Sequence, residues 1–182
     1  MGDPRKQKKK YETPKFPWRP DILESELRLL GEYGLRNKRE LWHHKDLLSK
    51  FRSMARSLLS MPTSSRTKLE SQLLSRLKFL GILPEDAVLD DVLDLDIESI
   101  LERRLQTIIQ RKGLAKTMYQ ARQLITHGHI AINNRKVSSP SYLVPKKEEN
   151  GIFYASTSLL NNPEHVFRQL LETMPKETNK NE

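Results

Sequence analysis

The run from Glu102 to Val144 constrains the fold more than any other part of the chain. Apolar residues recur at helical spacing from Ile97 to Ile109, and Gly113 is expected to cap the end of this first helix. A second helix should begin after Thr117, whose hydroxyl can cap it, and should end at the His-Gly pair 127–128. The two helices predict a compact helix-turn-helix unit.

A short hairpin is expected directly after these helices. His129 to Ile132 alternates like a strand, Asn133-Asn134 tolerates the left-handed backbone of a tight turn, and Lys136 can start the return strand. The segment IFYAS, residues 152–156, can add one more strand, after an exposed turn over KKEENG. The run therefore predicts two helices and a small antiparallel sheet.

The charges of this run indicate a polyanionic partner, because eight cations face one acid, Glu102, between residues 102 and 136. Solvated helix faces usually mix both signs. A guanidinium can bind a phosphate, and an amide can contact a base edge or a ribose hydroxyl, which favours RNA. The His127/His129 pair is interpreted as helix capping and RNA contact, not as a metal site. The predicted RNA contacts here are Arg103, Arg104, Arg111, Lys112, Lys116, Thr117, Arg122, Gln123, His127, His129, Arg135 and Lys136.

Composition supports this interpretation. The chain has 182 residues, a formal net charge of +9 and no cysteine, with a pI near 9.8. This charge favours nucleic acid over a membrane, since no long apolar segment or lipidation signal is found. Disulfides and thiolate zinc sites are excluded. No secretory signal is recognised, so a cytoplasmic location is expected.

Residues 1–20 are expected to form an extended basic arm, because prolines at 4, 14, 17 and 20 forbid a regular helix. Lys8, Lys9 and Lys10 are its proposed RNA contacts. Tyr11, Phe16 and Trp18 offer stacking surface for bases or packing surface for the body. A disordered solubilising tail is the alternative.

Residues 21–96 are expected to form a helical body. One helix should be capped by Asp21, a long one by Asn37 with Glu40 in a capping box, and a third by Thr67. Pro62 should stop the long helix. The cations of this long helix border its apolar face. They form either a ridge that follows a phosphate backbone or a plain solvated edge. The RNA contacts proposed on this helix are Lys38, Arg39, Lys45, Arg52 and Arg56.

Residues 84–102 carry eight acids and no lysine or arginine. A metal site is rejected, since apolar residues interrupt the acids and no glycine supplies the bend of a calcium loop. A helical solvent face is expected instead, which can keep this side away from RNA. Residues 156–182 should form a last short helix and a polar tail.

Several words of the sequence resemble a known family. RRLQ, RxGLA, ARQLI, HGHI and PSYLV resemble the RNA-binding fold of the small-subunit ribosomal protein four family. MGDPR, KKYETPKFPW and EYGLRNKRELW resemble its archaeal and eukaryotic branch. Asn134 stands where many members carry glycine, and asparagine can adopt the same conformation.

The resemblance implies a structural constituent of the small ribosomal subunit that binds 16S-type rRNA directly and early in assembly. It also implies ribosomal protein neighbours, a place near the mRNA entry path and an influence on translational accuracy. No cofactor, membrane or small-molecule substrate is expected. The expected fold is α+β and mostly helical, with an arm (1–20), a helical body (21–96), an RNA-binding module (97–155) and a C-terminal helix with tail (156–182).

Two other functions remain open. The same kind of module is appended to RNA-modifying enzymes and tRNA synthetases, but the chain has no glycine-rich nucleotide loop, GxSxG elbow or HExxH motif. We therefore expect no catalysis. A free RNA-binding chaperone would explain the module but no part of the chain before residue 97.

Overall fold

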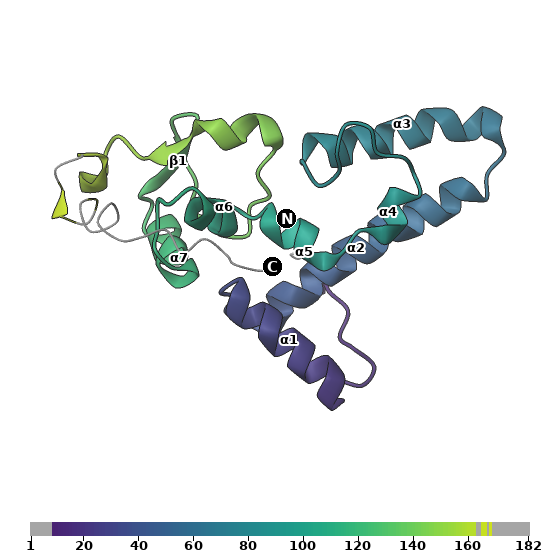
Figure 1. Cartoon of the computed structure of the whole chain (residues 1–182), viewed down its shortest axis with the longest axis horizontal. Coiled ribbons are helices and arrows are strands. Elements are labelled where there is room, and N and C mark those ends of the chain that lie inside the picture. Colours follow the sequence, from purple (N-terminus) through teal and green to yellow (C-terminus); the bar gives the residue numbers. More distant parts are fainter. Residues whose placement is uncertain (1–8, 163–164, 167, 169–182) are drawn as a thin grey trace, which may run out of the picture.

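The computed structural model describes residues 9–162, 165, 166 and 168. It is mostly helical with one small sheet, which confirms the predicted α+β class (Figure 1). The helices are α1 (Pro20–Glu32), α2 (Lys38–Leu59), α3 (Thr63–Phe79), α4 (Asp91–Asp94), α5 (Ile97–Glu102), α6 (Leu105–Arg111) and α7 (Met118–Thr126). The strands are β1 (Ile130–Ile132), β2 (Arg135–Lys136) and β3 (Ile152–Tyr154), with 3₁₀ helices at Lys146–Gly151 and Leu159–Asn161.

The long helix α2 is the axis of the helical body. The Glu40 backbone N–H donates to Asn37 Oδ1 at 3.1 Å, which confirms Asn37 as the N-cap. The helix ends at Leu59, before Pro62, as predicted. In Figure 1, α3 runs back beside α2. Their apolar faces share one buried cluster with residues of the 83–100 stretch. The cluster residues of α2 and α3 are Leu48, Phe51, Ala55, Leu58, Leu73 and Leu77.

Two predicted helix starts are wrong. Helix α1 begins at Pro20, with Arg19 at the N-cap position and no side-chain cap. Proline is favoured there because its fixed φ suits the first helical turn and its missing N–H is not needed. Helix α3 begins at Thr63, one turn before the predicted cap at Thr67. In both places proline sets the boundary.

The single helix predicted over 97–112 is also wrong, because the chain is extended at Arg104 between α5 and α6. Arg104 forms an isolated antiparallel bridge with Leu143. The neighbouring backbone completes it, with Leu105 N–H donating to the Tyr142 carbonyl at 2.8 Å and Val144 N–H donating to the Arg103 carbonyl at 3.0 Å. Pairing with a distant segment thus overrides the local helical periodicity.

The sheet has the order β2-β1-β3, and both pairings are antiparallel. Asn133 and Asn134 have φ of 46° and 66°, which confirms the predicted left-handed hairpin turn. Strand β3 completes the sheet, as predicted for IFYAS. The preceding KKEENG segment is a 3₁₀ helix and not a simple turn.

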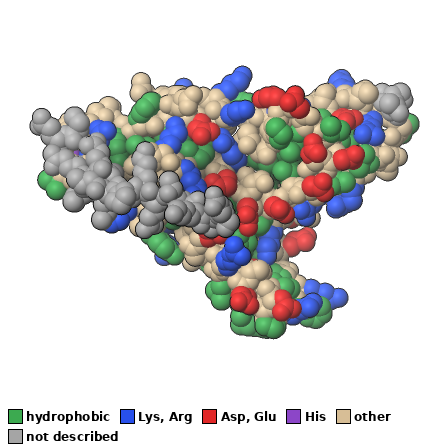
Figure 2. Space-filling view, viewed as in Figure 1, with side chains coloured by type: hydrophobic (Ala, Val, Ile, Leu, Met, Phe, Trp, Pro, Cys, Tyr) green, Lys and Arg blue, Asp and Glu red, His purple; other side chains and the backbone are tan. Residues whose placement is uncertain are grey.

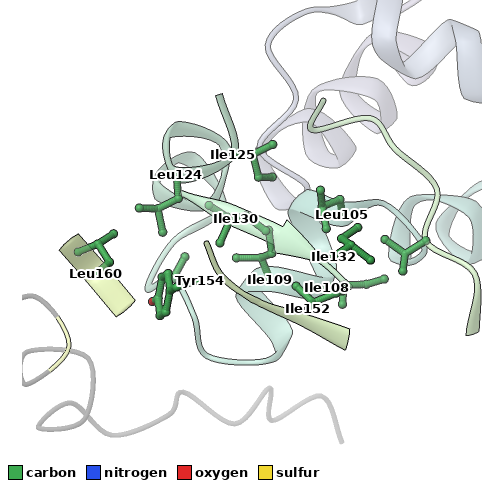
Figure 3. Packing of buried hydrophobic residues seen from close by; sticks show 13 residues of the cluster. Leu105, Ile108, Ile109, Leu124, Ile125, Ile130, Ile132, Ile152, Tyr154 and Leu160 are labelled. Carbon is green, nitrogen blue, oxygen red and sulfur yellow. The ribbon is translucent and has the colours of Figure 1, made fainter. Parts of the chain in front are cut away.

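The core of the module lies between α6, α7 and the sheet (Figure 3). Ile108 and Ile109 of α6 face Ile130 and Ile132 of β1, and Leu160 closes one end. Leu160 belongs to this cluster although it lies beyond the predicted module boundary at 155. In contrast, Ile100 of α5 belongs to the cluster of the body. The packing favours a module that begins near residue 103 and continues past 155.

The acidic stretch is only partly helical, as α4 and α5 are short and residues 84–90 lie outside them. The expected helical solvent face is therefore wrong for residues 84–90, whereas Asp91, Asp94 and Glu98 are exposed on α4 and α5. Acidic side chains gather over the middle and right of Figure 2, where Figure 1 draws α2 to α5. In the part of the chain that the structure describes, no cluster of acids and histidines has metal-site geometry. The predicted C-terminal helix and tail fall largely outside the described residues.

Candidate nucleic-acid interface

Glu40 joins the helical body to the module through two arginines. Its carboxylate accepts from Arg104 Nη2 at 3.0 Å and from Arg122 Nη1 and Nη2 at 3.1 and 2.6 Å. Burial acts to raise the pKa of Glu40, but the hydrogen bonds from Arg122 and Arg104 outweigh it and hold this pKa below its usual value. Glu40 therefore stays ionised between the two guanidinium groups.

Arg104 is fully buried, so its predicted contact with RNA is wrong. Its Nη1 lies 3.1 Å from His44 Nε2. A guanidinium can only donate, so Nε2 accepts and the imidazole is neutral with its proton on Nδ1. Burial, aided by the positive charge of Arg104, lowers the pKa of His44 to about 3. Arg104 thus stabilises the fold where the chain is extended between α5 and α6.

The predicted ridge on α2 is largely engaged with the protein itself. Glu26 of α1 is buried and accepts from Trp42 Nε1 at 3.0 Å and from Lys45 Nζ at 2.8 Å. Lys38 Nζ lies 3.3 Å from the same carboxylate. Burial opposes ionisation of Glu26, but these donors keep its pKa below the usual value. Lys38 and Lys45 therefore hold α1 against α2.

The other cations of α2 differ in their surroundings. Arg52 donates to the Leu95 carbonyl and is half-buried. Arg39 and Arg56 are exposed, and neither side chain has a hydrogen bond or ion pair with another residue that the structure describes. Of the proposed ridge (Lys38, Lys45, Arg52 and Arg56), only Arg56 keeps a side chain without a partner among the described residues. The RNA contacts of Arg56 and of Arg39, which lies outside that ridge, stay predictions.

Internal partners also occupy several cations of the module. Arg103 donates to Glu149 Oε2 and to the Val144 carbonyl, both at 2.9 Å. Arg111 pairs with Glu102 at 2.8 Å while remaining exposed. Lys112 donates to the backbone carbonyl of Glu149. Together with Arg122, which keeps 21% of its side chain exposed, these residues are held in place by acids or carbonyls.

Among the predicted RNA contacts of the module, three cations are exposed and unpaired within the described ranges: Lys116, Arg135 and Lys136. Lys116 precedes α7, and the other two form β2. Because no Asp or Glu lies between Glu102 and Glu148 in the sequence, these cations have no acidic neighbours along the chain. They are the best candidates for phosphate contacts.

The uncharged candidates have separate roles. Thr117 Oγ1 accepts from the Gln120 N–H at 3.2 Å, which confirms it as the cap of α7. Gln123 is exposed on the same helix. His129 forms a 2.9 Å hydrogen bond between Nδ1 and Ser158 Oγ, and its ring stacks against exposed His127 with centroids 6.2 Å apart. Gln123 and His127 therefore remain accessible to a ligand.

The described part of the arm contacts α2. The ring centroid of Tyr11 lies 6.0 Å from that of Trp42, and Lys9 Nζ lies 4.8 Å from the Tyr11 ring centroid. The Lys10 carbonyl accepts from His43 Nδ1 at 3.0 Å, which leaves the exposed Lys10 ammonium free. Lys8 lies outside the described residues. Tyr11 thus serves as packing surface for the body.

Sequence reasoning missed Arg36, which is exposed and has no side-chain partner among the described residues. It lies in the turn between α1 and α2. Gln106 Nε2 donates to the Gly34 carbonyl at 3.0 Å and to the Met118 carbonyl at 2.9 Å, so this turn packs against the start of α7. No signal in the sequence indicates this contact, because the burial of Gln106 depends on the fold. The fold brings Arg36 to the module.

Comparisons with known proteins agree with this arrangement. An S4 domain model matches residues 103–150. The small ribosomal subunit protein uS4 of Hyperthermus butylicus is 60% identical over 158 residues, covering 87% of this chain and 90% of that protein. Its counterpart in Metallosphaera sedula is 53% identical over 165 residues, covering 90% and 92%. The counterpart in Ignicoccus hospitalis is 55% identical over 158 residues, covering 87% and 95%.

These relatives are ribosomal proteins, which confirms the expectation that the chain is not an enzyme. No helix in the described part of the chain is long and apolar enough to span a membrane. The matched domain begins at Arg103, where the chain leaves α5, and includes every module cation discussed above. With high identity over most of both chains, the protein belongs to the archaeal branch of the small ribosomal subunit protein uS4 family.

Proposed function

We propose that the chain is a structural constituent of the cytoplasmic small ribosomal subunit and binds small-subunit rRNA directly. The observation that carries this proposal is the division of the module cations. Acids and carbonyls of the protein hold one group, whereas Lys116, Arg135 and Lys136 are left exposed without partners among the described residues. Unpaired cations on a surface poor in acids are what phosphate binding requires.

The ion pairs contribute by making the surface rigid. Glu40 ties α7 to α2, and Glu26 ties α1 to α2. Cations on both parts then meet the RNA as one preformed surface, which lowers the entropy lost on binding. Such a surface can neutralise phosphates of several RNA strands and stabilise a folded junction. This supports direct binding early in assembly.

The family resemblance further supports ribosomal proteins as neighbours and a position near the mRNA entry path with an effect on accuracy. The acidic side chains of residues 84–98 fit this arrangement, because RNA repels them and a basic ribosomal protein does not. If these acids keep the face away from RNA, a reversal of charge at Asp90 and Asp94 should change the bound orientation or raise rRNA affinity, and an unchanged orientation and affinity would count against this role. A loss of affinity would indicate that Asp90 and Asp94 hold a cation of the protein that assists RNA binding.

Competition binding tests the proposed function. Purified full chain is titrated onto labelled small-subunit rRNA of an archaeal relative, with large-subunit rRNA or tRNA as competitor. We expect at least tenfold preference for small-subunit rRNA, as specific complexes bind well above the nonspecific electrostatic background. If large-subunit rRNA and tRNA compete as well as unlabelled small-subunit rRNA does, the free RNA-binding chaperone would be favoured instead.

A further inference from the structure

Tyr119 is an exposed aromatic residue in the first turn of α7. Tyr119 is 63% exposed, and its side chain has no hydrogen bond or aromatic contact with the rest of the described chain. The core side of α7 is formed by Ala121, Leu124 and Ile125, which are all buried. Tyr119 therefore does not contribute to the core, and its surroundings indicate what it contacts.

Those surroundings are basic and polar. Gln123 follows Tyr119 by four residues on α7, a spacing that places the two side chains on one face of the helix. Lys116 lies just before the cap Thr117, outside the helix. The turn that carries Arg36 packs on Met118, the immediate neighbour of Tyr119. Lys116, Gln123 and Arg36 are exposed. An exposed aromatic ring therefore lies on the same helix face as exposed Gln123 and three residues after Lys116, a cation that has no partner among the described residues.

We infer that Tyr119 stacks on the base of an unpaired nucleotide in the bound RNA. Lys116 and Arg36 are placed to contact the phosphates on either side, and Gln123 to contact the base edge or the ribose. This rests on the proposed RNA binding. The nucleotide is unpaired because bases within a duplex already stack on their neighbours and expose no face. The exposed cations and the absence of any Asp or Glu between Glu102 and Glu148 favour an RNA over a protein partner.

Substitutions at Tyr119 test the inference on the full chain. Tyr119→Phe keeps the ring, whereas Tyr119→Leu keeps an apolar side chain without a stacking face. Phe153→Leu is the matched control, because Phe153 is also 63% exposed and lies in the same module, on β3. Affinity for archaeal small-subunit rRNA is measured by filter binding over a range of salt concentrations, and circular dichroism checks the fold of each variant.

We expect Tyr119→Leu to weaken binding by about 5- to 150-fold, the loss typical of one stacked base. The salt dependence should not change, since no phosphate contact is removed. Tyr119→Phe and Phe153→Leu should bind like the wild type. Wild-type affinity of Tyr119→Leu, or an equal loss in Tyr119→Phe, would overturn the stacking. Failure of the wild type to prefer this rRNA would instead overturn the proposed function.

Discussion

Glu40 accepts hydrogen bonds from Arg122 across the junction of the helical body and the module, with 2.6 Å between Oε1 and Nη2. The two residues are 82 positions apart in the sequence. The same carboxylate holds buried Arg104. One acid in the first turn of α2 thus determines how the start of α6 and one side of α7 lie against the body.

Replacing Glu40 with glutamine should destabilise the protein by about 1.5–3 kcal/mol, the range of hydrogen bonds to charged groups. Two arginines would lose their counter-ion, and one of them is fully buried. Urea unfolding at pH 7.5 measures the change. Glu24→Gln, on the exposed side of α1, is the control and should stay within about 0.5 kcal/mol of the wild type. Equal stability of the two variants would contradict the role of Glu40.

His44 should make the protein less stable as the pH falls. The folded state lowers its pKa from 6.5 to about 3, so the unfolded chain takes up the proton first. The stabilisation is full above pH 6.5 and is lost as the pH falls toward 3. Between pH 7.5 and 5 the free energy of unfolding should drop by about 2 kcal/mol.

Two histidine variants isolate this pH effect. His44→Gln can still accept from Arg104 but does not titrate, so its unfolding free energy should change less between pH 7.5 and 5. His43→Gln alters the exposed neighbour and should keep the wild-type dependence. The account of His44 fails if both variants follow the wild-type curve.

Gly34 is required where the turn after α1 meets α7. Its φ is +55°, and an added Cβ would lie 2.6 Å from the Cβ of Met118. Gly34→Ala should therefore cost more than about 1 kcal/mol, since both backbone strain and a clash oppose it. Gly31→Ala is the matched control: nothing lies within 4 Å, and alanine in helix α1 should stabilise by up to about 1 kcal/mol. Thermal unfolding of both variants measures these opposite shifts.

Local chemistry predicted most elements of this fold. Asn37 and Thr117 have side chains that cap helices, and Asn133-Asn134 has the conformational freedom of a hairpin turn. Each of these signals acts within a few residues. The break at Arg104 was missed because the apolar spacing continues through it, and the pairing with Leu143 that causes it is not local.

The candidate site was harder to predict because charge alone does not separate structural cations from exposed ones. In the sequence, Arg104 and Lys116 look equally suited to contact a phosphate. The fold brings Glu40 to Arg104 from 64 residues away, whereas no acid of the described residues pairs with Lys116. The partners of Lys38 and Lys45 depend in the same way on how α1 packs against α2.

The salt dependence of rRNA binding tests most directly whether the unpaired module cations form the interface. The triple variant Lys116→Ala, Arg135→Ala, Lys136→Ala is compared with a control triple variant on α3, Lys68→Ala, Arg76→Ala, Lys78→Ala. Both remove three positive charges. The module variant should lower the slope of log affinity against log salt by about 2–3, since each phosphate contact contributes about 0.7–0.9. The α3 variant should keep the wild-type slope, and an equal decrease in both variants would contradict the account.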